Sequence, residues 1–139
     1  HTEGRLPLPK AFKNSSLSKL DHLVVNTNDA DGFIKVYKDI FGIRLALDKV
    51  IEHWKSRMLF FRLNKTTIEV IEKKDDKEPN DKLWGLAWEV ENIKAAHDRL
   101  VSEGVDVTPV KEGIKENTLV ATINSHTCNV PTLIIEHLK

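Results

Sequence analysis

The stretch Leu20–Val25, with the sequence LDHLVV, decides the fold because the pattern that it opens recurs at Leu83–Val90, LWGLAWEV. Each stretch is an apolar strand that leads through Asn and Asp or Glu residues into a helical segment. Gly42 and Gly104, the residues expected to stop these two helices, are 62 positions apart. The recurrence predicts two similar halves that pack together about a pseudo-twofold axis.

Hydrophobic periodicity predicts the same order of elements in both halves: a strand, a helix and three further strands. In the first half the expected strands are 20–26, 43–51, 57–63 and 66–71, with a helix at 30–40. In the second half they are 83–90, 107–111, 119–124 and 132–138, with a helix at 93–102. Two βαβββ modules of this kind predict an α+β domain.

The charged composition between the halves sets the expected boundaries. Residues 1–19 are polar and contain prolines, so we expect a leader or linker there. A single domain is expected over 20–139, with module one at 20–73, a solvated connector at 74–82 and module two at 83–139. Because the chain begins with His1, an upstream domain that carries the chemistry is an open alternative.

The bulk composition excludes several classes of function. The 139 residues include 21 basic and 21 acidic side chains, so the net charge is zero and neither nucleic acid nor an anionic membrane is an expected partner. No apolar run approaches the roughly 20 residues that span a bilayer. Cys128 is the one cysteine, which excludes a disulfide framework and fits a reducing compartment such as the cytoplasm.

Alternation along the second half fixes which side of the sheet faces the helices. Large apolar side chains alternate along its first strand and are expected to pack on the helix: Trp84, Leu86, Trp88 and Val90. The residues between them, Gly85 included, then belong to the opposite, concave face. By the repeat, His22 shares this concave face with Gly85.

A carboxylate lies in the middle of the last strand of each half, Glu69 in the first and Glu136 in the second. Both lie in largely apolar strands, and an unpaired buried carboxylate is costly, so their recurrence favours a function. With His22 they predict a divalent-metal site, a donor set that suits Zn, Ni, Fe, Mn or Co. The alternative is that the three side chains line a solvated cleft and hydrogen-bond one another. His137 alternates with Glu136 and is expected to face away from it.

The paired βαβββ halves, opened by LDHLVV, resemble the vicinal oxygen chelate superfamily, which includes glyoxalase I, extradiol dioxygenases and the bleomycin-resistance binding proteins. The stretches LWGLAW and VPTLII look like a bacterial glyoxalase-like subgroup. The resemblance covers residues 18–139 and implies a curved mixed sheet. It also implies metal ligands at four positions, which fall on His22, Glu69, Gly85 and Glu136. The third of these, a glycine, cannot supply a ligand.

The resemblance implies two main functions. The first is a lyase or isomerase of the glyoxalase I type, in which the metal binds vicinal oxygens of a small substrate and Glu136 is the general base. The alternative is a metal-free binding protein of the bleomycin-resistance type, with aromatic walls from Trp54, Phe60 and Phe61. A dioxygenase is disfavoured because it needs a ligand at Gly85. Members of the superfamily often complete their clefts with a second chain, so a homodimer is expected; glutathione dependence is left open.

Overall fold

The computed structural model describes residues 17–54, 56–73 and 81–139 and shows an α+β fold. The strands are β1 (Leu17–Thr27), β2 (Arg44–Ile51), β3 (Ser56–Leu63), β4 (Thr66–Glu72), β5 (Lys82–Val90), β6 (Lys111–Glu112), β7 (Thr118–Ile123) and β8 (Thr132–His137). The helical segments are α1 (Ala30–Phe33), which continues as the π-helix η1 (Ile34–Ile40), the 3₁₀ turn η2 (Glu52–Trp54), and α2 (Ile93–Ser102). No helix in these described ranges is long and apolar enough to cross a bilayer.

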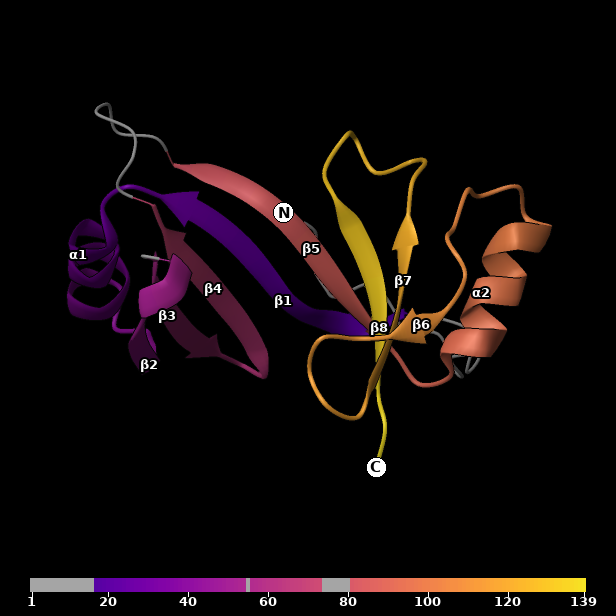
Figure 1. The fold of residues 1–139 in the computed structure, drawn as a ribbon, viewed down its shortest axis with the longest axis horizontal. Coiled ribbons are helices and arrows are strands. Elements are labelled where there is room, and N and C mark those ends of the chain that lie inside the picture. Colours follow the sequence, from indigo (N-terminus) through magenta and orange to yellow (C-terminus); the bar gives the residue numbers. More distant parts are fainter. Residues whose placement is uncertain (1–16, 55, 74–80) are drawn as a thin grey trace, which may run out of the picture.

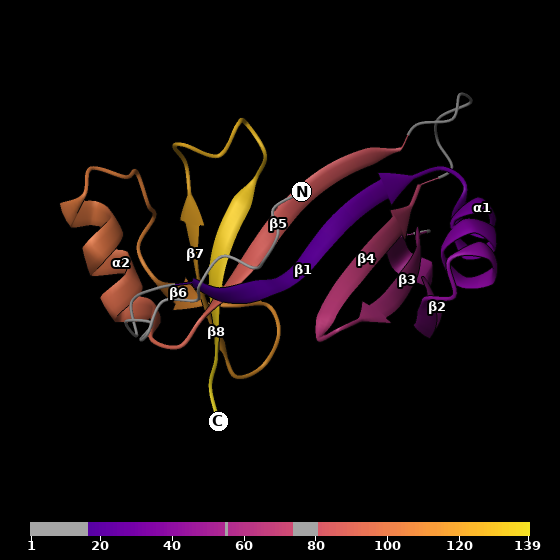
Figure 2. The same cartoon turned by 180° about the vertical axis from the view of Figure 1, so that it is seen from behind.

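One curved, mixed sheet joins the two modules, as the repeat predicts. Its strand order is β2-β3-β4-β1-β5-β8-β7-β6, with β1 parallel to β4, β5 parallel to β8, and β1 antiparallel to β5. α1 and α2 lie at opposite ends of the molecule, and β1 and β5 run side by side between them (Figures 1 and 2). Because His22 pairs with Ala87 and Val24 with Gly85, the local twofold axis passes close to the central pair of Leu23 and Leu86.

Each module has its own apolar core beneath its helix. In module one the buried side chains are Ala30, Leu59, Phe61 and Val70. In module two they are Val90, Ile93, Ala96, Ala121 and Ile134. Residues paired across neighbouring strands point to the same side of the sheet, and the pairs Val25–Val70, Leu23–Leu86 and Trp88–Ile134 connect the two cores, so both helices cover one face. We call the opposite side, which neither α1 nor α2 covers, the open face.

The helix ends follow the sequence closely. The Asp29 side chain accepts a hydrogen bond from the Gly32 amide at 3.0 Å, and the Asn92 side chain accepts one from Ala95 at 3.0 Å. After the helices, Gly42 and Gly104 take φ values of +74° and +85°, which only glycine adopts without strain. The predicted bounds of α2 are confirmed.

Helical spacing in the sequence predicts that Phe33, Val36, Tyr37 and Ile40 share one inward face, and this prediction is wrong in part because η1 is a π-helix. Phe33 and Tyr37 pack on the module-one core, but Val36 is 37% exposed and Ile40 is 66% exposed. A π-helix adds one residue to each hydrogen-bonded turn, so positions chosen at α-helical spacing rotate away from the core.

Several strand boundaries also differ from the prediction. β1 begins at Leu17, so three residues expected in the leader belong to the domain, and β5 begins at Lys82 within the expected connector. The rest of the leader, 1–16, and connector residues 74–80 lie outside the described residues. The strand expected at 107–111 is reduced to one isolated bridge, from Val107 to Ile123, because the regular pairing begins only at Lys111.

The apolar row expected on β5 is broken near its start. Trp88 and Val90 pack under α2, but Trp84 is 56% exposed. The pairing of β5 with β1 shifts by one residue between Val24 and Val25, which removes Trp84 from the alternation that the sequence predicts.

Candidate functional site

His22 and Glu69 share the open face, as predicted. Val70 packs under α1, so its neighbour Glu69 points to the other side of β4. In the parallel pairing of β1 with β4, His22 lies opposite Thr67 and Val24 opposite Glu69, which sets the two side chains two positions apart on adjacent strands. The two groups interact electrostatically across this short separation.

A bulge in β1 adds Asp21 to this face. Leu20 pairs with Trp88, but His22 pairs with Ala87, so Asp21 is the extra residue on β1. A bulge of this kind turns two consecutive side chains to the same side of the sheet. His22 Nδ1 accordingly lies 2.7 Å from Asp21 Oδ2. When Nδ1 carries the proton it donates to Asp21, and the lone pair of His22 is left on Nε2.

Two imidazole rings contact the Asp21 carboxylate. Its Oδ2 contacts His22, and its Oδ1 lies 2.8 Å from His137 Nε2. Burial acts to raise the pKa of Asp21, but hydrogen bonds and charge interactions with the two histidines outweigh it and hold the pKa below the ordinary value of 3.8. Asp21 is therefore ionised at neutral pH and fixes the orientation of both rings.

Glu69 has the opposite electrostatic character. It lies beside Phe60 of β3, and burial raises the pKa of its carboxyl above the ordinary value. The charge of Asp21 raises the pKa further, while His22 and Lys115 act to lower it. Two neighbouring carboxyl groups thus have pKa values shifted in opposite directions, a pattern that concentrates at functional sites.

The expectation that Glu136 shares this face is wrong. Ile134 packs under α2, and Glu136, two residues further, lies on the same side of β8. Its Oε1 accepts a hydrogen bond from the amide of Ile93, the first residue of α2, at 2.8 Å. Its metal-ligand and general-base roles stay predictions that require this carboxylate to leave the helix.

Glu72, not Glu69, is the counterpart of Glu136 in the repeat. Glu72 Oε2 accepts a hydrogen bond from the amide of Ala30, the first residue of α1, at 2.7 Å. Ala30 and Ile93 are 63 positions apart, and Glu72 and Glu136 are 64 apart. At the same spacing, the counterpart of Glu69 is Leu133, an apolar residue.

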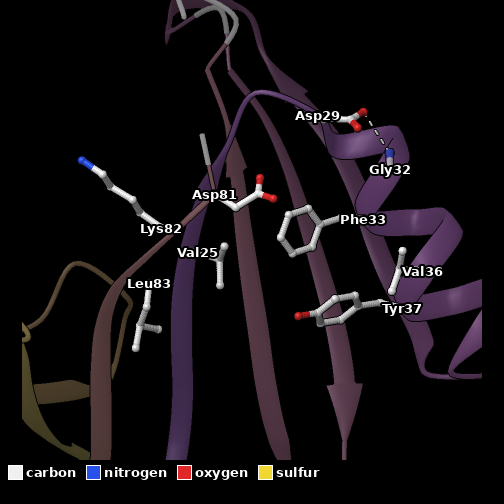
Figure 3. A pocket seen from close by; sticks show the side chains of 9 residues that line it. All are labelled: Val25, Asp29, Gly32, Phe33, Val36, Tyr37, Asp81, Lys82 and Leu83. Atoms are coloured by element: carbon white, nitrogen blue, oxygen red, sulfur yellow. Dashed lines mark hydrogen bonds between the residues drawn. The ribbon is translucent and has the colours of Figure 1, made fainter. Parts of the chain in front are cut away.

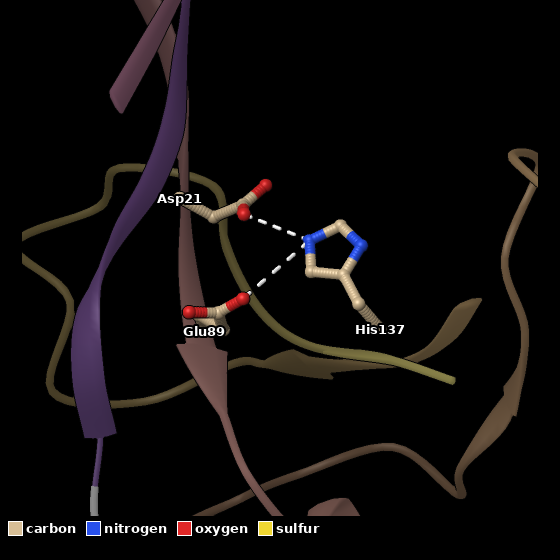
Figure 4. A group of neighbouring side chains, drawn as sticks. All are labelled: Asp21, Glu89 and His137. Atoms are coloured by element: carbon tan, nitrogen blue, oxygen red, sulfur yellow. Dashed lines mark hydrogen bonds and ion pairs between the residues drawn. The ribbon is translucent and has the colours of Figure 1, made fainter. Parts of the chain in front are cut away.

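Sequence reasoning missed a second group on the open face, formed by Asp21, Glu89 and His137 (Figure 4). Within the described ranges this is the group of three or more His, Cys, Asp or Glu residues close enough to hold a metal ion, with ligand atoms within 4.8 Å of one another. The prediction that His137 faces away from Glu136 is confirmed. Because two isoleucines precede Glu136, alternation alone does not show which of the two residues faces the helix.

Gly85 lies on the open face, as predicted, but the space beside it is filled. A Cβ at this position would lie 2.9 Å from the carbonyl oxygen of Pro131, which already accepts a hydrogen bond from the Leu86 amide at 2.9 Å. The obstacle is backbone, so it cannot rotate away.

Replacing Gly85 by alanine should therefore lower the free energy of unfolding by about 1–3 kcal/mol, as over-packing does elsewhere. Urea unfolding of Gly85→Ala, together with zinc titration of Gly85→His, would check this. If Gly85→His is as stable as the wild type and gains tight metal binding, the position is open and the argument fails.

A separate hollow of about 500 Å³ lies on the helix-covered side, between the N-terminal half of the first helical segment and the ends of β1 and β5 (Figure 3). Its large apolar lining residues are Val25, Phe33, Val36, Tyr37 and Leu83. None of the predicted site residues lines it. The paired acid and base groups therefore lie elsewhere, on the open face.

The predicted aromatic walls separate into different environments. Phe60 lies beside Glu69 on the open face, whereas Phe61 is fully buried in the core of module one. The side chain of Trp54 lies outside the described part of the structure. Cys128 is exposed and free of disulfide bonds.

Comparison with known proteins agrees with this fold. A family model described as the glyoxalase/bleomycin resistance protein/dioxygenase superfamily matches residues 21–122. No protein with a curated description matches the sequence. The fold is similar to methylmalonyl-CoA epimerase from Mycobacterium tuberculosis, with a TM-score of 0.67 and 21% identity over 94% of this chain and 95% of that chain.

Two further solved structures are similar at lower identity. A hypothetical protein from Bacillus halodurans C-125 gives a TM-score of 0.65 and 16% identity, over 87% of this chain and 95% of that one. A methylmalonyl-CoA epimerase variant from Streptomyces coelicolor, in complex with 2-nitronate-propionyl-CoA, gives a TM-score of 0.63 and 16% identity, over 89% of this chain and 100% of that one. Likeness at these identities establishes the fold.

Proposed function

Because this chain belongs to the glyoxalase/bleomycin resistance protein/dioxygenase superfamily, we propose that it is a glyoxalase-like isomerase or lyase. Its reaction would move a proton on a small substrate with vicinal oxygens, bound on the open face. The observation that carries the proposal is the pair formed by His22 and Glu69, with Asp21 behind the imidazole. Such a pair combines a base and an acid at one position of the sheet.

His22 is the proposed base. Asp21 is ionised and accepts a hydrogen bond from Nδ1–H, so the imidazole presents the lone pair of Nε2. In the proposed step, His22 Nε2 takes a proton from a hydroxyl-bearing carbon next to a carbonyl group. The C–H bond breaks and its electron pair forms a carbon–carbon double bond, while the π electron pair of the carbonyl moves to its oxygen.

Glu69 is the proposed acid. Burial favours the protonated form of its carboxyl group, which can give its proton to the carbonyl oxygen as charge develops there. The product of the first step is an enediol. Return of the proton from His22 to the neighbouring carbon, and of a hydroxyl proton to Glu69, completes an isomerisation with no other reactant.

The metal site that the superfamily implies does not fit the residues present. Its four positions fall on His22, Glu69, Gly85 and Glu136 by the resemblance, and on Leu133 in place of Glu136 by the observed repeat. Gly85 offers no donor and no space, Leu133 offers no donor, and Glu136 is bonded to α2. For this reason no step of the proposed reaction is assigned to a metal at those positions.

The same observation favours a second candidate, a binding protein of the bleomycin-resistance type. Loss of donors at two of the four positions removes the centre that polarises the substrate in metal-dependent relatives. In this candidate the open face holds a ligand beside Phe60 without reaction, and His22 and Glu69 only contact it.

Solvent-deuterium exchange separates the two candidates. A panel of small 2-oxo and 2-hydroxycarbonyl compounds, with one acyl-CoA thioester because a similar structure holds such a ligand, is followed by NMR in D₂O. We expect the wild type to exchange the proton next to the carbonyl of at least one compound, and His22→Gln to lose about 10²–10⁴-fold in rate. If the wild type and His22→Gln both bind a compound but neither exchanges its proton, the second candidate, a binding protein, is favoured over the enzyme.

A homodimer and a cytoplasmic location remain part of the proposal. Large apolar side chains are exposed on β5 and the first helical segment: Leu83, Trp84, Ile40 and Phe41. A second copy of the chain is the expected cover for some of them. The molar mass by light scattering tests the dimer, and a monomer at micromolar concentration contradicts it.

The proposed cytoplasmic location rests on the single free Cys128. Fractionation of the protein with periplasmic or secreted proteins would contradict it.

A further inference from the structure

We propose that Asp21, Glu89 and His137 form a binding site for one divalent transition-metal ion, at a place distinct from the four superfamily positions. The three side chains come from β1, β5 and β8 and converge on the open face (Figure 4). The inference is independent of the proposed reaction, because it concerns binding of the metal alone.

The geometry places two carboxylates around one imidazole nitrogen. His137 Nε2 lies 2.8 Å from Asp21 Oδ1 and 3.9 Å from Glu89 Oε1. The side chains are partly buried, with 15%, 27% and 34% of the Asp21, Glu89 and His137 side chains exposed. Two like charges held together in a partly desolvated place repel each other, and a divalent cation relieves this repulsion.

The bulge in β1 creates the site. Without the extra residue, Asp21 would point to the helix-covered face and only Glu89 and His137 would remain. Asp21 Oδ2 is hydrogen-bonded to His22, which orients the carboxylate, and Oδ1 faces His137 Nε2, so a bound cation would take the place of the proton between these two atoms. An outer hydrogen bond of this kind is the usual support of a metal-binding carboxylate.

The donor set restricts the metal. One imidazole nitrogen and two carboxylates suit Mn, Fe, Co, Ni or Zn, whereas Mg and Ca prefer oxygen ligands alone. A cationic side chain, Lys19, lies beside the site: its Nζ is 3.9 Å from Asp21 Oδ1 and also donates to the Lys65 carbonyl oxygen. The Lys19 ammonium group repels a bound cation, so replacing Lys19 by a neutral residue should tighten metal binding.

Calorimetric titration with Zn²⁺, and Co²⁺ titration followed by visible absorption, test the site in the purified full chain. We expect one ion per chain, at least about tenfold weaker binding in Glu89→Gln and in His137→Asn, and about two- to fivefold tighter binding in Lys19→Gln. Glu91→Gln and His97→Asn are the matched controls and should bind as the wild type does.

Glu69→Gln locates the ion. If it retains binding while Glu89→Gln loses it, the ion lies at the proposed site; the reverse result would place it at the superfamily positions and overturn the inference. Absence of binding in the wild type also overturns it. Circular dichroism confirms that each variant is folded, and if His137→Asn is not, the Glu89→Gln result decides. A variant that loses proton exchange but still binds the ion contradicts nothing about the metal site, because the two assays measure different properties.

Discussion

Replacement of Glu69 by glutamine should lower the rate of proton exchange by about 10²–10⁴-fold and raise the stability of the protein. The glutamine side chain has nearly the same shape and lies beside the same Phe60. It cannot, however, give a proton to a carbonyl oxygen. The exchange assay on the open-face substrate measures the first effect.

The gain in stability follows from the burial of Glu69. Burial is the largest cause of its raised pKa, which means that folding at neutral pH must either desolvate the carboxylate or protonate it, and either costs free energy. Glutamine removes this cost without opening a cavity. The expected gain is about 0.5–2 kcal/mol, the usual size of a single stabilising substitution. Thermal unfolding at neutral pH measures it.

Loss of proton exchange together with a gain in stability would identify Glu69 as a functional residue. Glu103→Gln, at an exposed glutamate, is the control and should change neither exchange nor stability. If Glu69→Gln loses activity and stability together, Glu69 is a structural partner of His22. If exchange is unchanged, the acid in the proposed reaction is another group, and the assignment of Glu69 is wrong.

The overall architecture was predictable because it depends on patterns that recur. Apolar alternation, Asp29 and Asn92 at the helix starts, and Gly42 and Gly104 at the ends each act locally, so one sequence reveals them. Two copies of the same order then predict paired modules. The common face of His22 and Glu69 followed from two regular patterns: the repeat gives His22 the direction of Gly85, and alternation sets Glu69 opposite its neighbours Ile68 and Val70.

The rest of the site depends on irregularities that alternation does not carry. The extra residue in β1 turns Asp21 to the open face, although strict alternation gives it the opposite direction from His22. On β8, Ile134 and Ile135 are both apolar, so the direction of Glu136 was undetermined. Glu69 and Glu136 are 67 positions apart, whereas the helix starts Ala30 and Ile93 are 63 apart and the two carboxylates bonded to them, Glu72 and Glu136, are 64 apart.

The contacts of Glu72 and Glu136 with the helix starts predict a second large effect, on stability. Glu72→Ala and Glu136→Ala should each lower the free energy of unfolding by about 1–3 kcal/mol, because each leaves a helix-start amide without its acceptor. The amides belong to Ala30 and Ile93, both fully buried, so water cannot easily replace the carboxylate. The attraction between a carboxylate and the helix N-terminus adds to the loss.

Glutamine at either position separates the two contributions. Its amide oxygen still accepts a hydrogen bond, so Glu72→Gln and Glu136→Gln should lose less stability than the alanine variants. Chemical denaturation of all four variants measures the series. The Glu136 variants also decide between the sequence prediction and the observed repeat: a carboxylate that only holds α2 can be replaced without loss of proton exchange. If Glu136→Gln stays fully stable but loses exchange, Glu136 is the general base after all, and its contact with Ile93 breaks when substrate binds.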